Sequence, residues 1–169
     1  MTHSVLAAEL DPKLNPSAAP GPTMRSLDQL VPSWDQALPA AERFKLVLGR
    51  DGVLDKETGL VWESTFGSGF SISWRGVFDS CRKSERGDRM GWRLPTVEEL
   101  LTLYDPTVRG LPIGHPFGTG GAPLKFWTAS VDPQSPGNFA LVDMTTPVVS
   151  VTYTNQAQSS VGILCVRGG

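Results

Sequence analysis

Hydrophobic residues recur at helical spacing around residue 80. They fall at positions i, i+3, i+4 and i+7, on one face of a helix; they are Trp74, Val77, Phe78 and Cys81. Basic residues crowd the end of this segment, where cations interact favourably with the negative pole of a helix, and Gly87 can close it. The pattern therefore predicts an amphipathic helix that turns Cys81 toward the core.

A second helix is predicted within the stretch GWRLPTVEELLTLYD, residues 91–105. Thr96 can cap its N-terminus, and Glu99 lies three residues on, which makes a Thr-x-x-Glu capping box. Asp105 precedes a proline, which ends the helix. The buried stripe of this helix is expected to consist of Val97, Leu100, Leu101 and Tyr104. Glu98 and Glu99 complement the positive pole, so we interpret this acidic pair as capping rather than catalytic groups.

Short runs of β-branched and aromatic residues, bounded by turn residues, predict strands on both sides of these helices. On the N-terminal side, a turn of helix and a strand at 44–48 precede a hairpin in which Gly59 can adopt a left-handed conformation. On the C-terminal side, four strands are predicted at residues 124–130, 138–144, 148–154 and 161–167. The last run is apolar on both faces, which predicts a strand that is buried on both faces. Together these elements predict an α+β domain.

The chain divides by composition into three parts. Residues 1–23 are rich in Pro, Ala and Ser without periodicity, and we expect a flexible N-terminal arm. Residues 24–49 are expected to form an extension that packs on the domain, which spans residues 50–169. Within the domain, residues 106–124 are rich in Pro and Gly and predict a long irregular loop, a kind of segment that is often functional or mobile.

Charged residues are sparse and nearly balanced, with 15 Lys and Arg against 17 Asp and Glu. This balance argues against binding to nucleic acid or to anionic lipid. No apolar run approaches the roughly eighteen residues of a membrane span. The segment SVLAAEL resembles the end of a secretory signal but lacks the apolar core before it, so no intact signal peptide is expected in this chain. An ordinary flexible terminus is favoured, and a truncated signal is the alternative.

Motifs for catalysis or metal binding are not found in the sequence. Cys81 and Cys165 do not form a Cys-x-x-Cys pair and have no histidine nearby, which argues against a zinc site. From the residues alone, they are either free core thiols or one disulfide. The glycine-rich stretches at 66–71 and 118–125 match neither a dinucleotide nor a phosphate fingerprint, and His115 is expected to be a solvated loop residue. We therefore expect no enzyme, no metal and no cofactor.

Six motifs occur in the order in which they occur in a known family. They are VLDKETGLVWE, Cys81 within a helix, GWRLPTVEELLTLYD, FWTAS, ALVDM and the terminal LCVRGG. With these motifs the chain resembles, over about residues 50–169, the Lcl C-terminal domain family, a bacterial domain named for a Legionella collagen-like surface adhesin. The resemblance implies a C-type-lectin-like fold, with two short helices packed on a small twisted antiparallel sheet, long loops on one side, and first and last strands that meet.

The resemblance also implies a disulfide between Cys81 and Cys165, and hence an extracytoplasmic location, which can be secreted, periplasmic or cell-surface. The WRLP motif is then expected to be a structural joint, with Trp92 and Leu94 filling the core between helix and sheet. Arg93 is expected to bond backbone carbonyls or a carboxylate, for which the candidates are Asp88, Asp105 and Asp143. The expected core motif comprises Trp92, Arg93, Leu94, Pro95 and Trp127.

The functional expectation is a noncatalytic binding or adhesion module of a bacterial or phage surface protein. The calcium motifs of sugar-binding lectins are missing, and the reactive cysteine pair of oxidases with this fold is reduced to one cysteine. Ligand-binding candidates are Tyr153, Asn155 and Gln156, whose side chains suit adaptable contacts, together with Arg109 and Lys125. A plain polar hairpin tip is the alternative interpretation of the first three.

The partner is expected to be a neutral glycan or a protein. The namesake adhesin binds sulfated polysaccharides, but lysine and arginine are few in the C-terminal half of this chain. A second hypothesis is a structural or assembly subunit of an envelope or filament complex, which would bring a homo-oligomer or an assembly partner. Lectin-like domains also serve as diversified receptors whose C-terminal strands vary, a further alternative for this surface.

Overall fold

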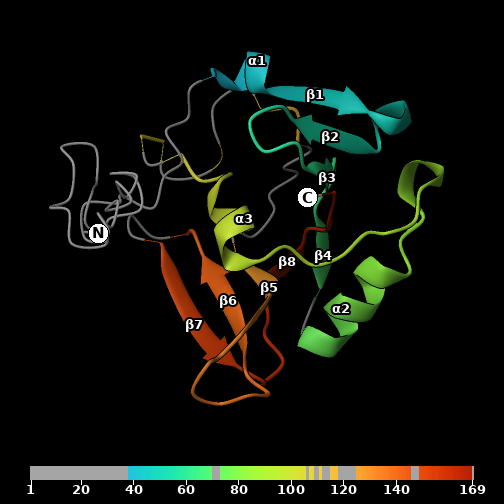
Figure 1. The fold of residues 1–169 in the computed structure, drawn as a ribbon. Helices are drawn as coiled ribbons and strands as arrows, with labels where there is room; N and C mark the ends of the chain where they lie inside the picture. Colours follow the sequence, from blue (N-terminus) through green and yellow to red (C-terminus); the bar gives the residue numbers. More distant parts are fainter. Residues whose placement is uncertain are drawn as a thin grey trace, which may run out of the picture. The chain divides into compact units, whose positions relative to one another are not determined.

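The computed structural model describes residues 38–69, 73–105, 107–108, 111, 115–117, 125–145 and 149–168 (Figure 1). The chain divides into two compact units, Met1–Pro32 and Ser33–Gly169, and all described residues belong to the second. The predicted arm, most of the predicted extension and much of the predicted 106–124 loop therefore lie outside the described residues.

Two sheets and a few short helices make up the described part of the chain, which confirms the α+β class. The helical elements are α1 (Ala40–Arg43), η2 (Leu48–Arg50), α2 (Trp74–Arg82), η3 (Arg86–Asp88) and α3 (Val97–Leu101). The first sheet has the order β1-β2-β3-β9, with strands Phe44–Val47, Gly52–Asp55, Val61–Glu63 and Val166–Arg167. The second has the order β4-β8-β5-β6-β7, with strands Gly67–Gly69, Val161–Ile163, Lys125–Val131, Phe139–Asp143 and Ser150–Thr154.

The β2–β3 hairpin forms where the sequence predicts it. Gly52 pairs with Glu63 across the two strands, and Gly59 has a φ of +74° in the turn. Asp55 organises this turn, because its carboxylate accepts hydrogen bonds from the Glu57 amide at 3.0 Å and from the Thr58 hydroxyl at 2.9 Å. Local sequence was sufficient here, since a left-handed position favours glycine and an Asp side chain can bond the backbone two residues on.

The two main helices are also confirmed, with one difference at the end of α2. Ser73 caps α2 and Thr96 caps α3, and α3 carries the predicted capping box with Glu99. Gly87, however, does not close α2, which ends at Arg82. It lies within η3 with a φ of +64°, and a Cβ there would come within 2.5 Å of the Leu48 side chain. This glycine is needed for close packing between η2 and η3.

The centre of the second sheet is buried on both faces because a helix packs on each. Alternate residues of β5 point to opposite sides of the sheet. Phe126 lies in one core cluster with Leu100 of α3, and Trp127 lies in the other with Val77 and Cys81 of α2. The predicted core residues Trp92, Leu94, Pro95 and Trp127 are all buried.

The single last strand predicted at 161–167 is wrong, because the chain forms two short strands there that belong to different sheets. β8 ends at Ile163 in the second sheet and β9 begins at Val166 in the first. The run is apolar on both sides because it crosses between the two cores: Cys165 belongs to the α2 cluster, whereas Leu164 and Val166 belong to the other.

The arrangement of strands also differs from the single antiparallel sheet that the resemblance implied. β8 pairs with β5 in parallel, through Phe126 and Gly162. The last strand, β9, pairs with β3, whereas the first strand, β1, lies at the other edge of that sheet. A hairpin therefore separates the first strand from the last, and the two do not meet.

Candidate functional site

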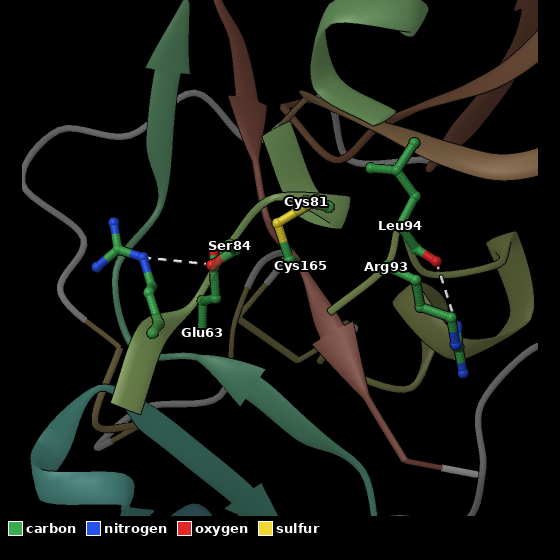
Figure 2. The surroundings of a disulfide bond; sticks show 7 residues. Glu63, Cys81, Ser84, Arg93, Leu94 and Cys165 are labelled. Atoms are coloured by element: carbon green, nitrogen blue, oxygen red, sulfur yellow. Dashed lines mark hydrogen bonds and ion pairs between the residues drawn. A yellow bond between two sulfur atoms is a disulfide. The ribbon is translucent and has the colours of Figure 1, made fainter. Parts of the chain in front are cut away.

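The disulfide expected from the family resemblance is present. Cys81 on α2 is bonded to Cys165, with a Cα–Cα distance of 5.5 Å across 84 residues of sequence (Figure 2). Both cysteines are buried. The bond ties α2 to the segment between β8 and β9, and so fixes the crossing point of the two sheets.

Beside the disulfide lies a buried carboxylate that the sequence did not reveal. The Glu63 amide donates to the Cys165 carbonyl, and its Oε1 accepts a 2.7 Å bond from the Ser84 hydroxyl and lies 3.3 Å from the Arg86 Nε (Figure 2). Burial raises the pKa of Glu63 above its ordinary value, although Ser84 and Arg86 oppose the shift. This cluster holds η3 against β3, and only the fold brings its members together.

Arg93 is the central side chain of a joint between α3 and the C-terminal strand. Its guanidinium makes two 2.7 Å bonds to the Glu99 carboxylate and donates to the Gly168 carbonyl at 3.0 Å. Its backbone amide and carbonyl pair with those of Val166 at 2.9 and 2.8 Å. The expectation that Arg93 bonds backbone carbonyls and a carboxylate is confirmed, but none of Asp88, Asp105 and Asp143 is that carboxylate.

Glu99 is the partner because the capping box already aims its side chain backwards. Its Oε2 accepts from the Thr96 amide at 2.9 Å, which places the carboxylate at the N-terminal side of α3, where Arg93 reaches it. The bonds from Arg93 lower the pKa of Glu99 below its ordinary value, and the same pairing raises the pKa of Arg93. Glu99 is therefore a structural residue.

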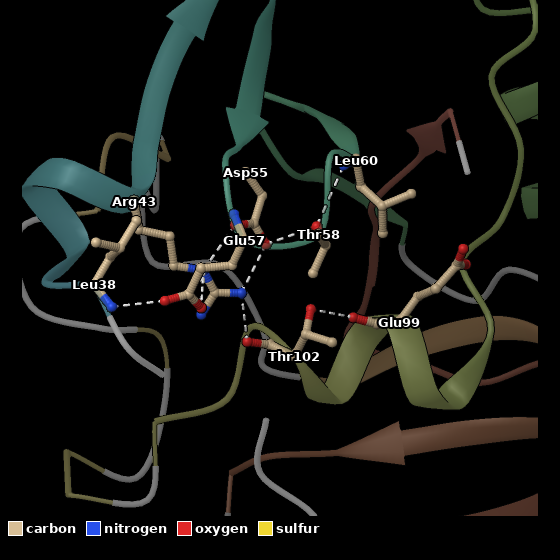
Figure 3. Close-up of polar contacts among 8 residues, drawn as sticks. All are labelled: Leu38, Arg43, Asp55, Glu57, Thr58, Leu60, Glu99 and Thr102. Atoms are coloured by element: carbon tan, nitrogen blue, oxygen red, sulfur yellow. Dashed lines mark hydrogen bonds and ion pairs between the residues drawn. The ribbon is translucent and has the colours of Figure 1, made fainter. Parts of the chain in front are cut away.

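A buried ion pair connects the β2–β3 turn to the end of α3. Arg43 donates to Asp55 at 2.8 and 2.7 Å, and it also donates to the Thr102 carbonyl at 2.9 Å (Figure 3). Both charged side chains are buried almost completely. The Arg43 Nε also lies 3.2 Å from Glu57. Sequence reasoning missed this network because Arg43 lies 12 residues from Asp55 and 59 from Thr102, and nothing local pairs them.

An aromatic cluster on α2 is closed off by its own members. Trp74 stacks on Phe139 with ring centroids 3.4 Å apart, and on Phe78 at 4.8 Å. Arg75 and Arg82 both lie over the Phe78 ring. These ring faces are occupied by protein groups, so the cluster serves as packing between α2 and β6 and does not offer an open stacking platform.

His115, which was expected to be solvated, is half-buried. Its Nδ1 accepts a 3.1 Å bond from the Phe117 amide, and burial lowers its pKa. Phe117 is itself buried and packs on Phe44 and Phe66, with centroids 5.5 and 5.7 Å apart. This part of the predicted loop is drawn into the core by the phenylalanine, which explains the error.

The predicted ligand residues lie on or next to β7, the edge strand of the second sheet. Four of the five β7 side chains are exposed, whereas the middle of β6 beside it is buried. Tyr153 is 42% exposed, and Val151, on the same face of the strand, is 39% exposed. Asn155 and Gln156 follow the end of β7 and are exposed.

The two amides at this tip bond to each other. Gln156 Nε2 donates to Asn155 Oδ1 at 2.7 Å, and the Gln156 amide donates to the Thr154 hydroxyl at 3.1 Å. Within the described residues, this leaves the Asn155 amide nitrogen and the Gln156 side-chain oxygen without a partner. The Asn155 amide nitrogen can therefore donate a hydrogen bond to a ligand, and the Gln156 side-chain oxygen can accept one.

The remaining predicted ligand residues do not join this tip. Lys125 pairs across the sheet with Asp143, which in turn pairs with Ser150 at the start of β7. Its Nζ lies 2.9 Å from the Asp143 carboxylate. Burial tends to raise the pKa of Asp143, but bonds from Thr145 and Lys125 hold it below its ordinary value. The charge of Lys125 is thus neutralised by Asp143. Measured along the strand direction, Lys125 is about 17 Å from Asn155. Arg109 lies outside the described residues.

The register of the sheet brings a second loop to the tip that sequence reasoning did not include. Phe139 pairs with Thr154, so the β5–β6 turn, residues 132–138, lies at the same end of the sheet as residues 155–160 (Figure 1). Residues 133–137 are exposed, and Asp132 Oδ1 accepts from the Gln134 amide at 2.9 Å. Recognising β6 and β7 as paired antiparallel strands would have shown from the sequence that the 132–138 turn lies near residues 155–160.

We name this polar surface, whose one charged residue is Asp132, the β7 tip: the β7 strand, the 132–138 turn and residues 155–160. It offers an aromatic ring, hydroxyls and amides, which can stack on a ligand and exchange hydrogen bonds with it. Among the residues that the structure describes, no group of three or more His, Cys, Asp or Glu is arranged to hold a metal ion. In the same residues, no helix has the length and apolar character to cross a membrane.

The fold and the joint define an α+β domain closed by one disulfide. A family model described as the Lcl C-terminal domain matches residues 51–167, which is more than half of the chain. The chain belongs to the Lcl C-terminal domain family. A search of curated proteins and a search of solved structures each returned no match.

Proposed function

We propose that this domain is a noncatalytic binding module that recognises a glycan or a protein through the β7 tip. The observation that carries the proposal is the contrast in exposure across one sheet. Phe126, Trp127, Leu141 and Val142 are buried on β5 and β6, whereas the next strand exposes nearly all its side chains. An edge strand that carries an exposed tyrosine beside amide-rich loops resembles the contact surfaces that binding proteins use.

The chemistry of the β7 tip favours an uncharged ligand. Lys125, the described basic residue among the candidates, forms an ion pair with Asp143. This pair lies beside the start of β7, at the opposite end from Asn155 and Gln156. Tyr153 supplies apolar contact with few rotatable bonds, and Asn155 and Gln156 supply donors and acceptors that a sugar hydroxyl or a peptide group can use. A neutral glycan or a protein loop therefore fits this surface better than a polyanion does.

The proposed setting is extracytoplasmic, on a bacterial or phage surface. Its support is the disulfide, since such bonds form and persist in oxidising compartments. We further propose that the domain belongs to the C-type-lectin-like superfamily, supported by two helices followed by strands and by a disulfide from the first of them to the closing segment. The assembly-subunit alternative is supported by the outer edge of β7, beside which the described residues place no strand, since exposed edges are templates for pairing with another chain.

The direct test is a glycan-array and cell-surface binding screen of the purified protein, followed by the variant Tyr153→Ala/Asn155→Ala/Gln156→Ala. Binding should be lost in this variant while the free energy of unfolding changes by no more than about 0.5 kcal/mol per exposed site. The matched control is Lys83→Ala/Met90→Ala, in exposed positions after α2, which should bind as the unchanged protein does. Retained binding in the triple variant would remove the β7 tip as the ligand site.

A further inference from the structure

The edges of the two sheets differ in how they are protected against pairing with another chain. β1 carries the exposed Lys45, and β4 has only three residues, two of them glycine. β9 has two residues, and Arg93 pairs with Val166 alongside it. Short edges, lysines and covering segments are the usual devices that prevent edge-to-edge association. Three of the four sheet edges in the described part of the chain therefore carry such a device.

β7 carries none of them. Its sequence, Ser-Val-Thr-Tyr-Thr, contains no charge and no proline, and its five residues pair with β6 in regular antiparallel register without a bulge. Among the described residues, no strand occupies its outer side. A strand of this kind presents unpaired backbone donors and acceptors along a straight edge, and its residues have high β-propensity.

The side chains of β7 also match themselves in one antiparallel register. If Thr152 of one copy lies opposite Thr152 of a second copy, Val151 faces Tyr153 of the other chain and Ser150 faces Thr154. All five residues are then paired, with aromatic–β-branched pairs on one face and hydroxyl pairs on the other. Both kinds of cross-strand pair are favourable, and no like charges are opposed.

We propose that β7 is a self-association edge, along which a second copy of this chain pairs antiparallel about a two-fold axis at Thr152. The second sheet then runs without interruption through both copies. This is the isologous arrangement that most symmetric dimers adopt. Self-association goes beyond the proposed ligand recognition. The two functions are compatible, because edge pairing uses the backbone and leaves the faces of the sheet open.

The geometry of such a dimer has a consequence for binding. Residues directly opposite in an antiparallel pair point to the same side of the sheet. Val151 and Tyr153 of both copies therefore form one apolar strip on a single face. The 155–160 loops, by contrast, lie at opposite ends of the paired strands, so that the dimer presents two separated copies of the loop region to a surface. Two linked sites raise avidity toward a repeated ligand without any new contact.

The test uses charge at the two-fold axis, where each copy meets itself. Light scattering coupled to size exclusion, over micromolar to millimolar concentrations, should show a monomer–dimer equilibrium for the unchanged protein. Thr152→Lys and Thr152→Glu should each weaken the dimer by roughly tenfold or more, because like charges oppose each other across the axis. An equimolar mixture of the two variants should restore dimers, because each lysine then faces a glutamate.

Control variants separate this register from any general effect of charge. Val131→Lys adds the same charge at an exposed position at the end of β5 and should leave the dimer unchanged. Thr152→Cys should form an intermolecular disulfide under mild oxidation and Val131→Cys should not; among the described residues, the native chain has no free cysteine to interfere. Circular dichroism melting verifies that each variant folds.

Three outcomes overturn the proposal. The first is a monomer at every concentration. The second is a dimer that Thr152→Lys does not weaken or that mixing the two charged variants does not restore. The third is a monomer that pairs through β7 only with a foreign extended peptide, which would make β7 a peptide-binding edge instead.

Discussion

Two regions of this domain, the joint around Arg93 and the β7 tip, are built on opposite principles. In the joint, both terminal nitrogens of the Arg93 guanidinium and both carboxylate oxygens of Glu99 have hydrogen-bond partners, and the disulfide lies nearby. At the β7 tip, side chains such as Tyr153 are exposed, and a single hydrogen bond joins the side-chain amides of Asn155 and Gln156. The joint therefore has few hydrogen-bonding groups free to contact a ligand, whereas the β7 tip has many.

The difference indicates a division of labour within one domain. Charge-assisted bonds hold the partly exposed Arg93 side chain to fixed partners, whereas exposed neutral groups on an ordered strand keep their bonding capacity for another molecule. The most informative experiments are therefore those that change one region and measure whether the other responds. Changes in the joint should alter stability, and changes at the tip should alter association.

The largest effect on the free energy of unfolding is expected from Trp92→Ala. Trp92 is buried in the core cluster that contains Val77 and Cys81 of α2, and removal of its ring leaves a cavity that costs about 3–5 kcal/mol. Denaturant unfolding followed by circular dichroism measures this loss. Tyr153→Ala is the matched aromatic control, and because this side chain is exposed the change should stay within about 0.5 kcal/mol. Equal losses in the two variants would abolish the distinction between the regions.

The next largest loss in the free energy of unfolding is expected from removal of the disulfide. The double variant Cys81→Ser/Cys165→Ser opens a loop of 84 residues, which in the chain-entropy account costs about 4 kcal/mol. Thermal unfolding of the double variant, compared with the native protein with and without reductant, measures the effect. Mass spectrometry without reduction should first show the native protein lighter by the mass of two hydrogens. Two free thiols, or an unchanged melting temperature, would contradict the role given to this bond.

The smallest stability effects concern two carboxylates whose pKa values move in opposite directions, Glu99 in the joint and Glu63 beside the disulfide. The lowered pKa of Glu99 means that its stabilisation is present above the unfolded value and is lost as pH falls through the folded value. The raised pKa of Glu63 means that its contribution is greatest below the unfolded value of 4.5 and is lost as pH rises through the folded value.

Glutamine substitutions measure these two contributions separately. Glu99→Gln should destabilise at neutral pH by about 1–3 kcal/mol, because charge-assisted bonds are lost, and by less in acid. Glu63→Gln should become relatively more favourable as pH rises from acid to neutral, because it removes a buried charge. Unfolding curves between acid and neutral pH show both trends. Parallel pH dependences in the two variants would mean that one of the assigned environments is wrong.

Local signals account for what the sequence predicted correctly. The capping box from Thr96, the helical spacing up to Cys81 and the left-handed position of Gly59 each depend on residues a few positions apart. Such features are set by backbone geometry and hydrogen bonding within one element, and they survive in any tertiary context.

The features that sequence reasoning missed all join distant segments. Arg43 finds Asp55 across a buried interface, and the strand predicted through Cys165 is divided because the chain changes sheets there. Similarly, the 132–138 turn joins the β7 tip only through the register of Phe139 with Thr154. Periodicity shows which face of a strand is buried but not which sheet that strand enters, so these contacts required the fold itself.

Amide hydrogen exchange on the native protein at low concentration tests the separation of joint and edge most directly. The backbone amides of Arg93 and Val166 each donate to the carbonyl of the other residue within the joint, and they should exchange only through global unfolding. The amides of β7 should exchange much faster, through local opening of an edge strand. Protection of β7 equal to that of Arg93 and Val166 in dilute monomer would show that the strand is part of the rigid core, and would contradict the account of an exposed recognition edge.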